Sequence, residues 1–190
     1  LDDVDRIEII RGPGAALWGA NAVNGVINII TKHSADTQHS QLTAGGGTHE
    51  QGFGSYRYGT ELGKDTTGRV YVKGARRGGF THLEGTPAND RWDKVQAGFR
   101  VDSLWTEQDA VTLQGDIYYD NINQASDHLS LTSPGYTQNI NEIIKVSGGN
   151  MFGKLKHIFS PTSDISLQAF YNVYSRNESS YSDLRQVAEL

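Results

Sequence analysis

The sequence predicts an all-β membrane barrel architecture, an antiparallel meander of about seven strands preceded by a small α/β segment. Three observations predict it. Apolar and polar residues alternate over segments of about ten residues, the length that a tilted membrane-spanning strand needs. The connections between these segments alternate between short and long, as they do in outer-membrane barrels. Glycine accounts for 22 of the 190 residues, which is typical of β structure with many turns.

The composition changes near residue 34, and the change predicts a domain boundary there. Before it, Arg6 to Ile10 and Gly25 to Thr31 are β-branched runs that predict two strands. A glycine-rich turn and a short helix-compatible stretch at 15–19 separate them. We therefore expect residues 1–33 to form one domain and residues 34–190 another.

Period-two alternation dominates the second domain. Apolar side chains occupy the odd-numbered positions of its three clearest segments: Val95, Ala97, Phe99, Val101, Val111, Leu113, Ile117, Ile165, Leu167 and Val173. Weaker alternation at 40–47, 51–62, 69–78 and 149–159 brings the number of expected strands to seven. The opposite faces carry Gln, Thr, Lys, Arg and Asp, which a wet or filled lumen accepts and a dry core rejects. We expect the odd-numbered residues to face lipid.

The connections predict which ends of the strands lie together. Three are short, at 63–68, 103–109 and 160–164, whereas Gly79 to Trp92 and Asn121 to Gly148 are long. An up-and-down meander sends every second connection to the same side. We expect both long loops at one end, outside the cell, where a ligand arrives.

Charge and composition exclude several functions. The net charge is −5, and the 17 Lys and Arg residues are scattered, so no nucleic-acid partner is expected. No Cys is present, which removes disulfides and thiolate metal sites. No Ser-His-Asp order or nucleophile elbow is recognisable, so we expect no enzyme, catalytic residue or cofactor. The uncharged run 12–31 holds Pro13 and four glycines, which excludes a spanning helix.

The six histidines lack the paired helical spacing of a metal site, and no metal ligand is assigned. His82 and His128 fall in the two long loops, where solvated histidines are the simpler interpretation. A phosphate-binding role for the glycine-rich turn is disfavoured because no Gly-Lys-Ser/Thr ending follows.

The most specific signature runs from Val4 to Thr31. It contains Arg-Ile-Glu-Ile-Ile-Arg-Gly-Pro-Gly at 6–14, continues through Leu-Trp-Gly at 17–19, and ends with Asn-Gly-Val-Ile-Asn-Ile-Ile-Thr at 24–31. This stretch resembles the end of the plug domain in TonB-dependent outer-membrane receptors. The likeness covers about 30 residues without a gap and extends more loosely over the remaining chain.

The resemblance implies a barrel of about 22 strands filled by a globular plug. Residues 1–33 would be the C-terminal part of the plug and residues 34–190 the N-terminal part of the barrel. The implied function is import of a scarce nutrient into a Gram-negative bacterium. The preferred candidate is an iron chelate (siderophore), and the alternative is cobalamin or another compound. Its partners would be that small-molecule ligand, outer-membrane lipid and the TonB energy-coupling protein, bound through a segment missing from this chain. The resemblance assigns no ligand-contacting residues.

The resemblance also assigns a role to two arginines. Plug arginines in this family commonly meet barrel carboxylates, so Arg11, and Arg6 with it, would hold the plug in place. Breaking one side of such a desolvated pair costs about 3 to 5 kcal/mol. The alternative is that Arg11 is a plain turn residue before Gly12 and Pro13.

Two other functions stay open. A passive porin or adhesin barrel would explain the strands but not the plug-like residues 1–33. A soluble β-rich carbohydrate-binding or hydrolytic protein would explain the alternation, but its strands should bury one face against a second sheet.

Overall fold

The computed structural model describes residues 3–14, 22–129, 131, 136–179 and 181–189. In these residues, ten strands form two antiparallel sheets, one of two strands and one of eight. No helix in the described ranges is long and apolar enough to cross a membrane. The ten antiparallel strands confirm the all-β prediction.

The two-stranded sheet is a hairpin of β1 (Val4–Arg11) and β2 (Gly25–Thr31). Its pairing runs from Val4↔Thr31 at the base to Arg11↔Gly25 at the tip, as the two β-branched runs predicted. At the tip, a Cβ on residue 25 would lie 2.7 Å from the backbone oxygen of Ile10, so Gly25 is required for the close approach of the strands. The helix expected at 15–19 lies outside the described residues.

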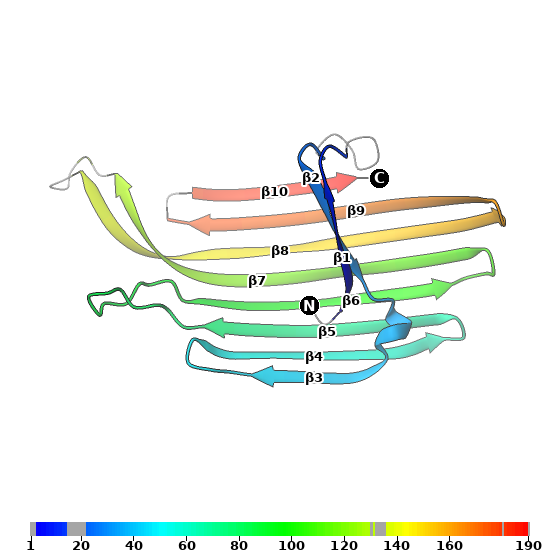
Figure 1. The fold of residues 1–190 in the computed structure, drawn as a ribbon, viewed down its shortest axis with the longest axis horizontal. Helices are drawn as coiled ribbons and strands as arrows, with labels where there is room; N and C mark the ends of the chain where they lie inside the picture. Colours follow the sequence, from blue (N-terminus) through cyan, green and yellow to red (C-terminus); the bar gives the residue numbers. More distant parts are fainter. Residues whose placement is uncertain (1–2, 15–21, 130, 132–135, 180, 190) are drawn as a thin grey trace.

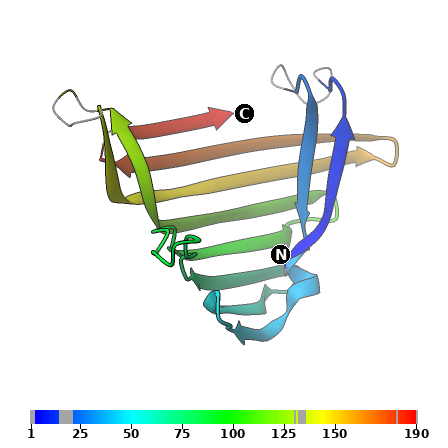
Figure 2. The ribbon, with the colours of Figure 1, turned by 60° about the vertical axis from the view of Figure 1, so that its left-hand side comes forward.

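A short 3-10 helix, η1 (Ser34–Thr37), connects the hairpin to the eight-stranded sheet. The strands of that sheet are β3 (His39–Gly45), β4 (Glu50–Gly63), β5 (Thr66–Arg77), β6 (Trp92–Leu104), β7 (Asp109–Leu129), β8 (Thr137–Ser160), β9 (Ser163–Glu178) and β10 (Tyr181–Glu189). They pair in sequence order, and the described part of the sheet is open, with β3 and β10 at its edges. The hairpin runs across the strand direction on one face of this sheet (Figures 1 and 2).

The sheet confirms the seven predicted strands and adds an eighth, β10. Along β10, neither set of alternate residues is consistently apolar. Leu184 and Ala188 share their face with Ser182 and Gln186, and Val187 shares the other with charged residues. Period-two alternation therefore gave no signal there.

The register shows which residues share a face, because directly paired residues in an antiparallel sheet point the same way. Val101 pairs with Leu113, Ala97 with Ile117, and Leu155 with Leu167. All ten odd-numbered apolar residues predicted to face lipid lie on one face by this pairing. We call this the outer face, and the face that contacts the hairpin the inner face.

The connections leave the sheet as expected. Those after β3, β5, β7 and β9 lie at one end, and those after β4, β6 and β8 lie at the other (Figure 1). The end that carries the long connections is called the loop end below.

The prediction of a second long loop is wrong. The stretch Asn121 to Gly148 is mostly strand, because β7 continues to Leu129, β8 begins at Thr137, and these two residues pair. Its Asn, Ser and Asp residues favoured a loop, but the alternation that ends in Ile144 and Val146 is the signal of a strand, and both residues are buried. The outer face turns polar here, at Asn121, Asn123, Lys145 and Ser147. The β7–β8 hairpin therefore extends beyond the apolar band of the sheet.

Candidate functional site at the junction of hairpin and sheet

The segment 31–37, which we call the junction, leaves β2 and runs along the inner face of the sheet. Arg100 on β6 donates from Nη1 to Thr31 Oγ1 at 2.7 Å. Arg69 on β5 donates from Nη1 to the carbonyl oxygen of Lys32 at 2.8 Å and to Thr37 Oγ1 at 3.1 Å. Two sheet arginines thus bind both ends of the junction.

The buried carboxylate of Asp102 lies at the centre of this network. It accepts two hydrogen bonds from Arg100, from Nε at 2.7 Å and from Nη2 at 2.9 Å. It also accepts the backbone N–H of Ser34 at 2.9 Å and the hydroxyl of Thr112 at 2.8 Å. Charge-assisted bonds of this kind are the strong ones, so Asp102 fixes the junction to β6 and β7.

The junction is tightly packed as well as hydrogen-bonded. Ser34 and Thr37 are fully buried, and the hydroxyl of Ser34 bonds to Thr67 on β5. A Cβ on residue 59 of β4 would collide with the backbone oxygen of Thr37. Gly59 therefore allows η1 to lie directly against the sheet.

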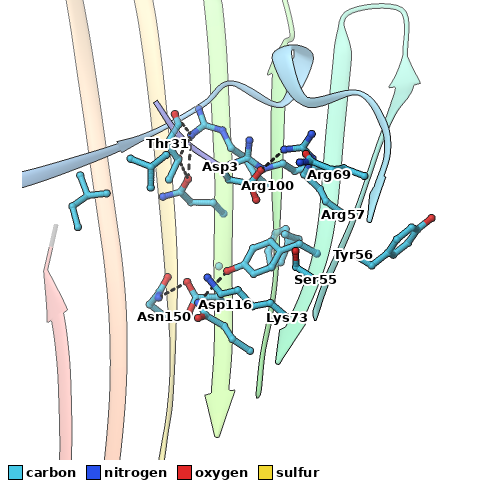
Figure 3. Close-up of a pocket in the computed structure, with 18 residues that line it drawn as sticks. Asp3, Thr31, Ser55, Tyr56, Arg57, Arg69, Lys73, Arg100, Asp116 and Asn150 are labelled. Carbon is cyan, nitrogen blue, oxygen red and sulfur yellow. Dashed lines mark hydrogen bonds and ion pairs between the residues drawn. The ribbon is translucent and has the colours of Figure 1, made fainter. Parts of the chain in front are cut away.

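A third sheet arginine holds the start of the hairpin. Arg57 on β4 pairs with Asp3, with Nη1 to Oδ1 at 2.7 Å. The backbone N–H of Lys32 donates to the carbonyl oxygen of Asp3 at 2.9 Å. The chain thus enters and leaves the hairpin side by side, over the three arginines (Figure 3).

A cavity of about 400 Å³ lies beside these contacts, between the hairpin and the inner face (Figure 3). The hairpin and junction contribute Asp3 and Thr31 to its wall. The sheet contributes the three arginines together with Lys73, Gln96 and Asp116, among others. Asn150 donates to Asp116 at 2.9 Å, and Gln96 donates to the hydroxyl of Tyr71 at 3.1 Å. The arrangement can bind polar or charged groups.

The two arginines selected from the sequence lie elsewhere on β1. Arg6 pairs within its own strand, with Glu8 and Asp5, each at 2.8 Å. The hydrogen bond from Arg6, and a second one from Asn28, hold the pKa of Glu8 below its usual value. Arg11 is exposed near the tip of the hairpin. Their contact with barrel carboxylates stays a prediction.

Sequence reasoning missed the sheet arginines and Asp102. Arg57, Arg69, Arg100 and Asp102 occupy inner-face positions of strands whose outer face is apolar. Buried charged groups require partners, so several charges on one face of adjacent strands indicate a second layer over that face. This signal was available, but pairing it with residues 3 and 31–37 required the structure.

A second polar cluster lies at the loop end. Glu142 accepts the backbone N–H of Ser179 at 2.7 Å and the hydroxyl of Ser126 at 3.2 Å, and Ser126 bonds to His128 at 2.8 Å. The N–H of Ser179 lowers the pKa of Glu142. The contact ties the β7–β8 extension to the end of β9. Across the described ranges, no three His, Cys, Asp or Glu residues are grouped to hold a metal ion.

The chain is similar to curated receptors and transporters over parts of its length. It is 30% identical to the vitamin B12 transporter BtuB of Vibrio vulnificus over 105 residues, which is 54% of the chain and 16% of that protein. It is 38% identical to the vitamin B12 transporter BtuB of Photobacterium profundum over 85 residues, 43% of the chain and 13% of the relative. It is 52% identical to the ferric enterobactin receptor of Pseudomonas aeruginosa over 42 residues, 22% of the chain and 6% of the relative.

The matched part of the chain thus spans no more than 16% of the length of these three relatives. No protein-family model matches the chain.

Proposed function

Because the chain belongs to the TonB-dependent outer-membrane receptors of Gram-negative bacteria, we propose that it is part of a protein that imports a scarce nutrient through a plugged barrel. The observation that carries the proposal is the placement of the hairpin on the polar inner face of a sheet whose outer face is apolar. A wall with lipid on one side and a filled lumen on the other has this pattern.

In this proposal, residues 1–33 are the end of the plug and residues 34–190 begin the barrel wall. The junction supports the boundary, because the hairpin before it and the sheet after it are separate antiparallel units joined by η1. The sheet arginines and Asp102 would then fix the plug to the wall at the end opposite the loop end. Arg11 would meet barrel carboxylates further along the chain.

The proposed cargo is an iron chelate, with vitamin B12 as the second candidate. The relatives support both, since two are named as vitamin B12 transporters and one as a ferric enterobactin receptor. Import would draw energy from the inner-membrane TonB protein. None of the three relatives is named as an enzyme, which supports a role in transport.

Uptake by whole cells tests the proposal. The full-length protein is expressed in a bacterium that lacks its own receptors, and cells are given ⁵⁵Fe-loaded enterobactin or ⁵⁷Co-labelled vitamin B12. We expect accumulation of one label that stops when the tonB gene is deleted. Uptake that continues without TonB would indicate a passive pore and would contradict the proposal.

Deletion of residues 1–33 from the full-length protein gives a second measurement. A plugged importer should lose coupled uptake and should admit unrelated small solutes, measured as increased sensitivity to large antibiotics. A passive barrel should show no change in either measurement.

A further inference from the structure

The cavity between the hairpin and the sheet has an excess of positive charge. Its wall contains four basic side chains and two acidic ones. The basic side chains are Arg57, Arg69, Lys73 and Arg100, and the acidic ones are Asp3 and Asp116. The carboxylates of Asp3 and Asp102, the latter just outside the cavity, are already bonded to Arg57 and Arg100. With Asp116 counted, three carboxylates face four cations, so one positive charge is in excess, and Arg69 and Lys73 are the two cations that form no ion pair with the described residues.

Arg69 is the unusual member, because its residue is only 5% exposed. Its hydrogen bonds reach a backbone carbonyl and a threonine hydroxyl, both of which are neutral. Arg69 forms no ion pair with any of the described residues. A buried cation that has only neutral acceptors gains strongly from an added anion, because the low dielectric strengthens their attraction.

Two neighbouring arginines each have one donor that is left unsatisfied by the described residues. The Nε atoms of Arg57 and Arg69 are buried and have no hydrogen-bond partner within the described part of the chain. Arg57 pairs with Tyr71, and Arg69 pairs with Gly59, so the two arginines are diagonal neighbours on the inner faces of β4 and β5. Buried N–H groups are nearly always satisfied in folded proteins.

We infer that this cavity binds an oxyanion, the carboxylate or phosphate group of a small soluble molecule, between Arg57 and Arg69. The planar guanidinium presents its N–H groups in a fork that matches these anions. Lys73 lies further along β5 on the same wall and adds a third cation. A volume of about 400 Å³ is enough for a small molecule. The site does not depend on the import proposal, since a passive barrel with this wall would bind the same anion.

The test uses the full-length receptor in detergent, titrated with inorganic phosphate at constant ionic strength against chloride. We expect a saturable rise in the unfolding temperature with phosphate. A crystal soaked in selenate should show an anomalous peak within hydrogen-bond distance of the guanidinium groups of Arg57 and Arg69. No rise and no peak would overturn the inference. A carboxylate from another part of the receptor that fills the site would give the same result and would equally overturn the binding of a small soluble anion.

Variants locate the binding. Arg69→Gln should weaken phosphate binding at least tenfold, and Arg69→Lys, which keeps the charge but removes the fork, should weaken it less. Arg185→Gln is the matched control, because Arg185 is exposed on β10 and pairs with Asp183. Equal affinity in Arg69→Lys, Arg69→Gln and the wild type would overturn the inference. If Arg69→Gln does not fold, the Arg69→Lys affinity and the position of the selenate peak still decide the question.

Discussion

At the scale of single residues, Asp102 and Gly59 determine how the junction meets the sheet. Asp102 provides charge, since it accepts bonds from Arg100, Ser34 and Thr112. Gly59 provides space, since any side chain there would meet the backbone of Thr37. The first contact is electrostatic and the second is steric, so they can be tested separately.

Asp102→Asn should destabilise the full-length protein by about 3 to 5 kcal/mol, because it leaves the Arg100 guanidinium beside a neutral side chain in a buried site. Urea unfolding in lipid vesicles measures the free energy of unfolding. Asp164→Asn is the control, since Asp164 forms an exposed pair with Lys156 and should change stability by less than about 1 kcal/mol. Equal effects of the two substitutions would contradict the role given to Asp102.

Gly59→Ala should cost about 1 to 3 kcal/mol, because the added methyl forces η1 away from β4. Gly52→Ala, on the same strand, is the matched control, since a Cβ there meets nothing within 4 Å. Hydrogen exchange at the Ser34 amide should accelerate in the first variant alone. Unchanged exchange there would show that η1 does not need the close approach.

At the scale of elements, the β7–β8 extension is the largest departure from the sequence prediction. Its strands pair up to Leu129↔Thr137, and its inner-face residues Ile144 and Val146 are buried. Glu142 binds the extension to Ser179, just after β9. The loop end therefore contains a paired, anchored hairpin where a long irregular loop was expected.

The Glu142 contact should depend on pH. Its pKa is lowered in the folded protein by the Ser179 N–H, so the stabilisation is present above the unfolded pKa of about 4.5 and is lost as pH falls through the folded value. Hydrogen exchange at the Ser179 amide, corrected for intrinsic rates, should be slow while Glu142 is ionised and faster once the pH falls below the lowered pKa of Glu142. Glu142→Gln should lose most of this difference. A wild-type profile that is flat with pH would contradict the assignment.

At the scale of the whole molecule, the two faces of the sheet have opposite requirements. Ile117 and Ile165 on the outer face are largely exposed, whereas the inner face carries the junction and the cavity. In a membrane, lipid would cover the outer face. Substitutions of the same kind should then have different effects on the two faces.

Ile117→Lys should cost about 2 to 4 kcal/mol in lipid vesicles, because a lysine there would meet the hydrocarbon. Gln168→Lys lies on the inner face of β9, away from lipid, so it should change the free energy of unfolding by only about 0.5 kcal/mol, as ordinary surface substitutions do. Unfolding in urea measures both. Neutral results at both positions would refute the assignment of faces.

The proposed orientation, with the long connections outside the cell, predicts a pattern of proteolysis. Protease added to intact cells should cut the connection at 78–91 and spare the turn at 105–108, because the long connections should face outward. Mass spectrometry of the fragments identifies the cut. Cleavage at 105–108 alone would invert the orientation.

Much of this fold follows from local pattern. The odd-numbered run from Val95 to Val101 fixed both a strand and its apolar face, and the runs at 6–10 and 25–31 gave the hairpin. The candidate site could not be predicted from local pattern, because its partners lie far apart in the sequence. Arg69 and Lys32 are 37 residues apart, and Asp102 and Ser34 are 68 residues apart. Contacts at that separation depend on how the hairpin folds back over the sheet, which no local period encodes.

The side-by-side entry and exit of the hairpin determine how it would respond to mechanical load. Asp3 and Lys32 are joined at its base, and the first ladder pair is Val4 with Thr31. With the junction held by Asp102 and Arg69, tension on the N-terminal side first breaks the pair of Asp3 with Arg57 and then pulls the two strands apart from that base. Antiparallel ladder bonds lie perpendicular to the strands, so they open one after another and never all together. The hairpin would therefore unzip at low force while the junction stays attached to the wall.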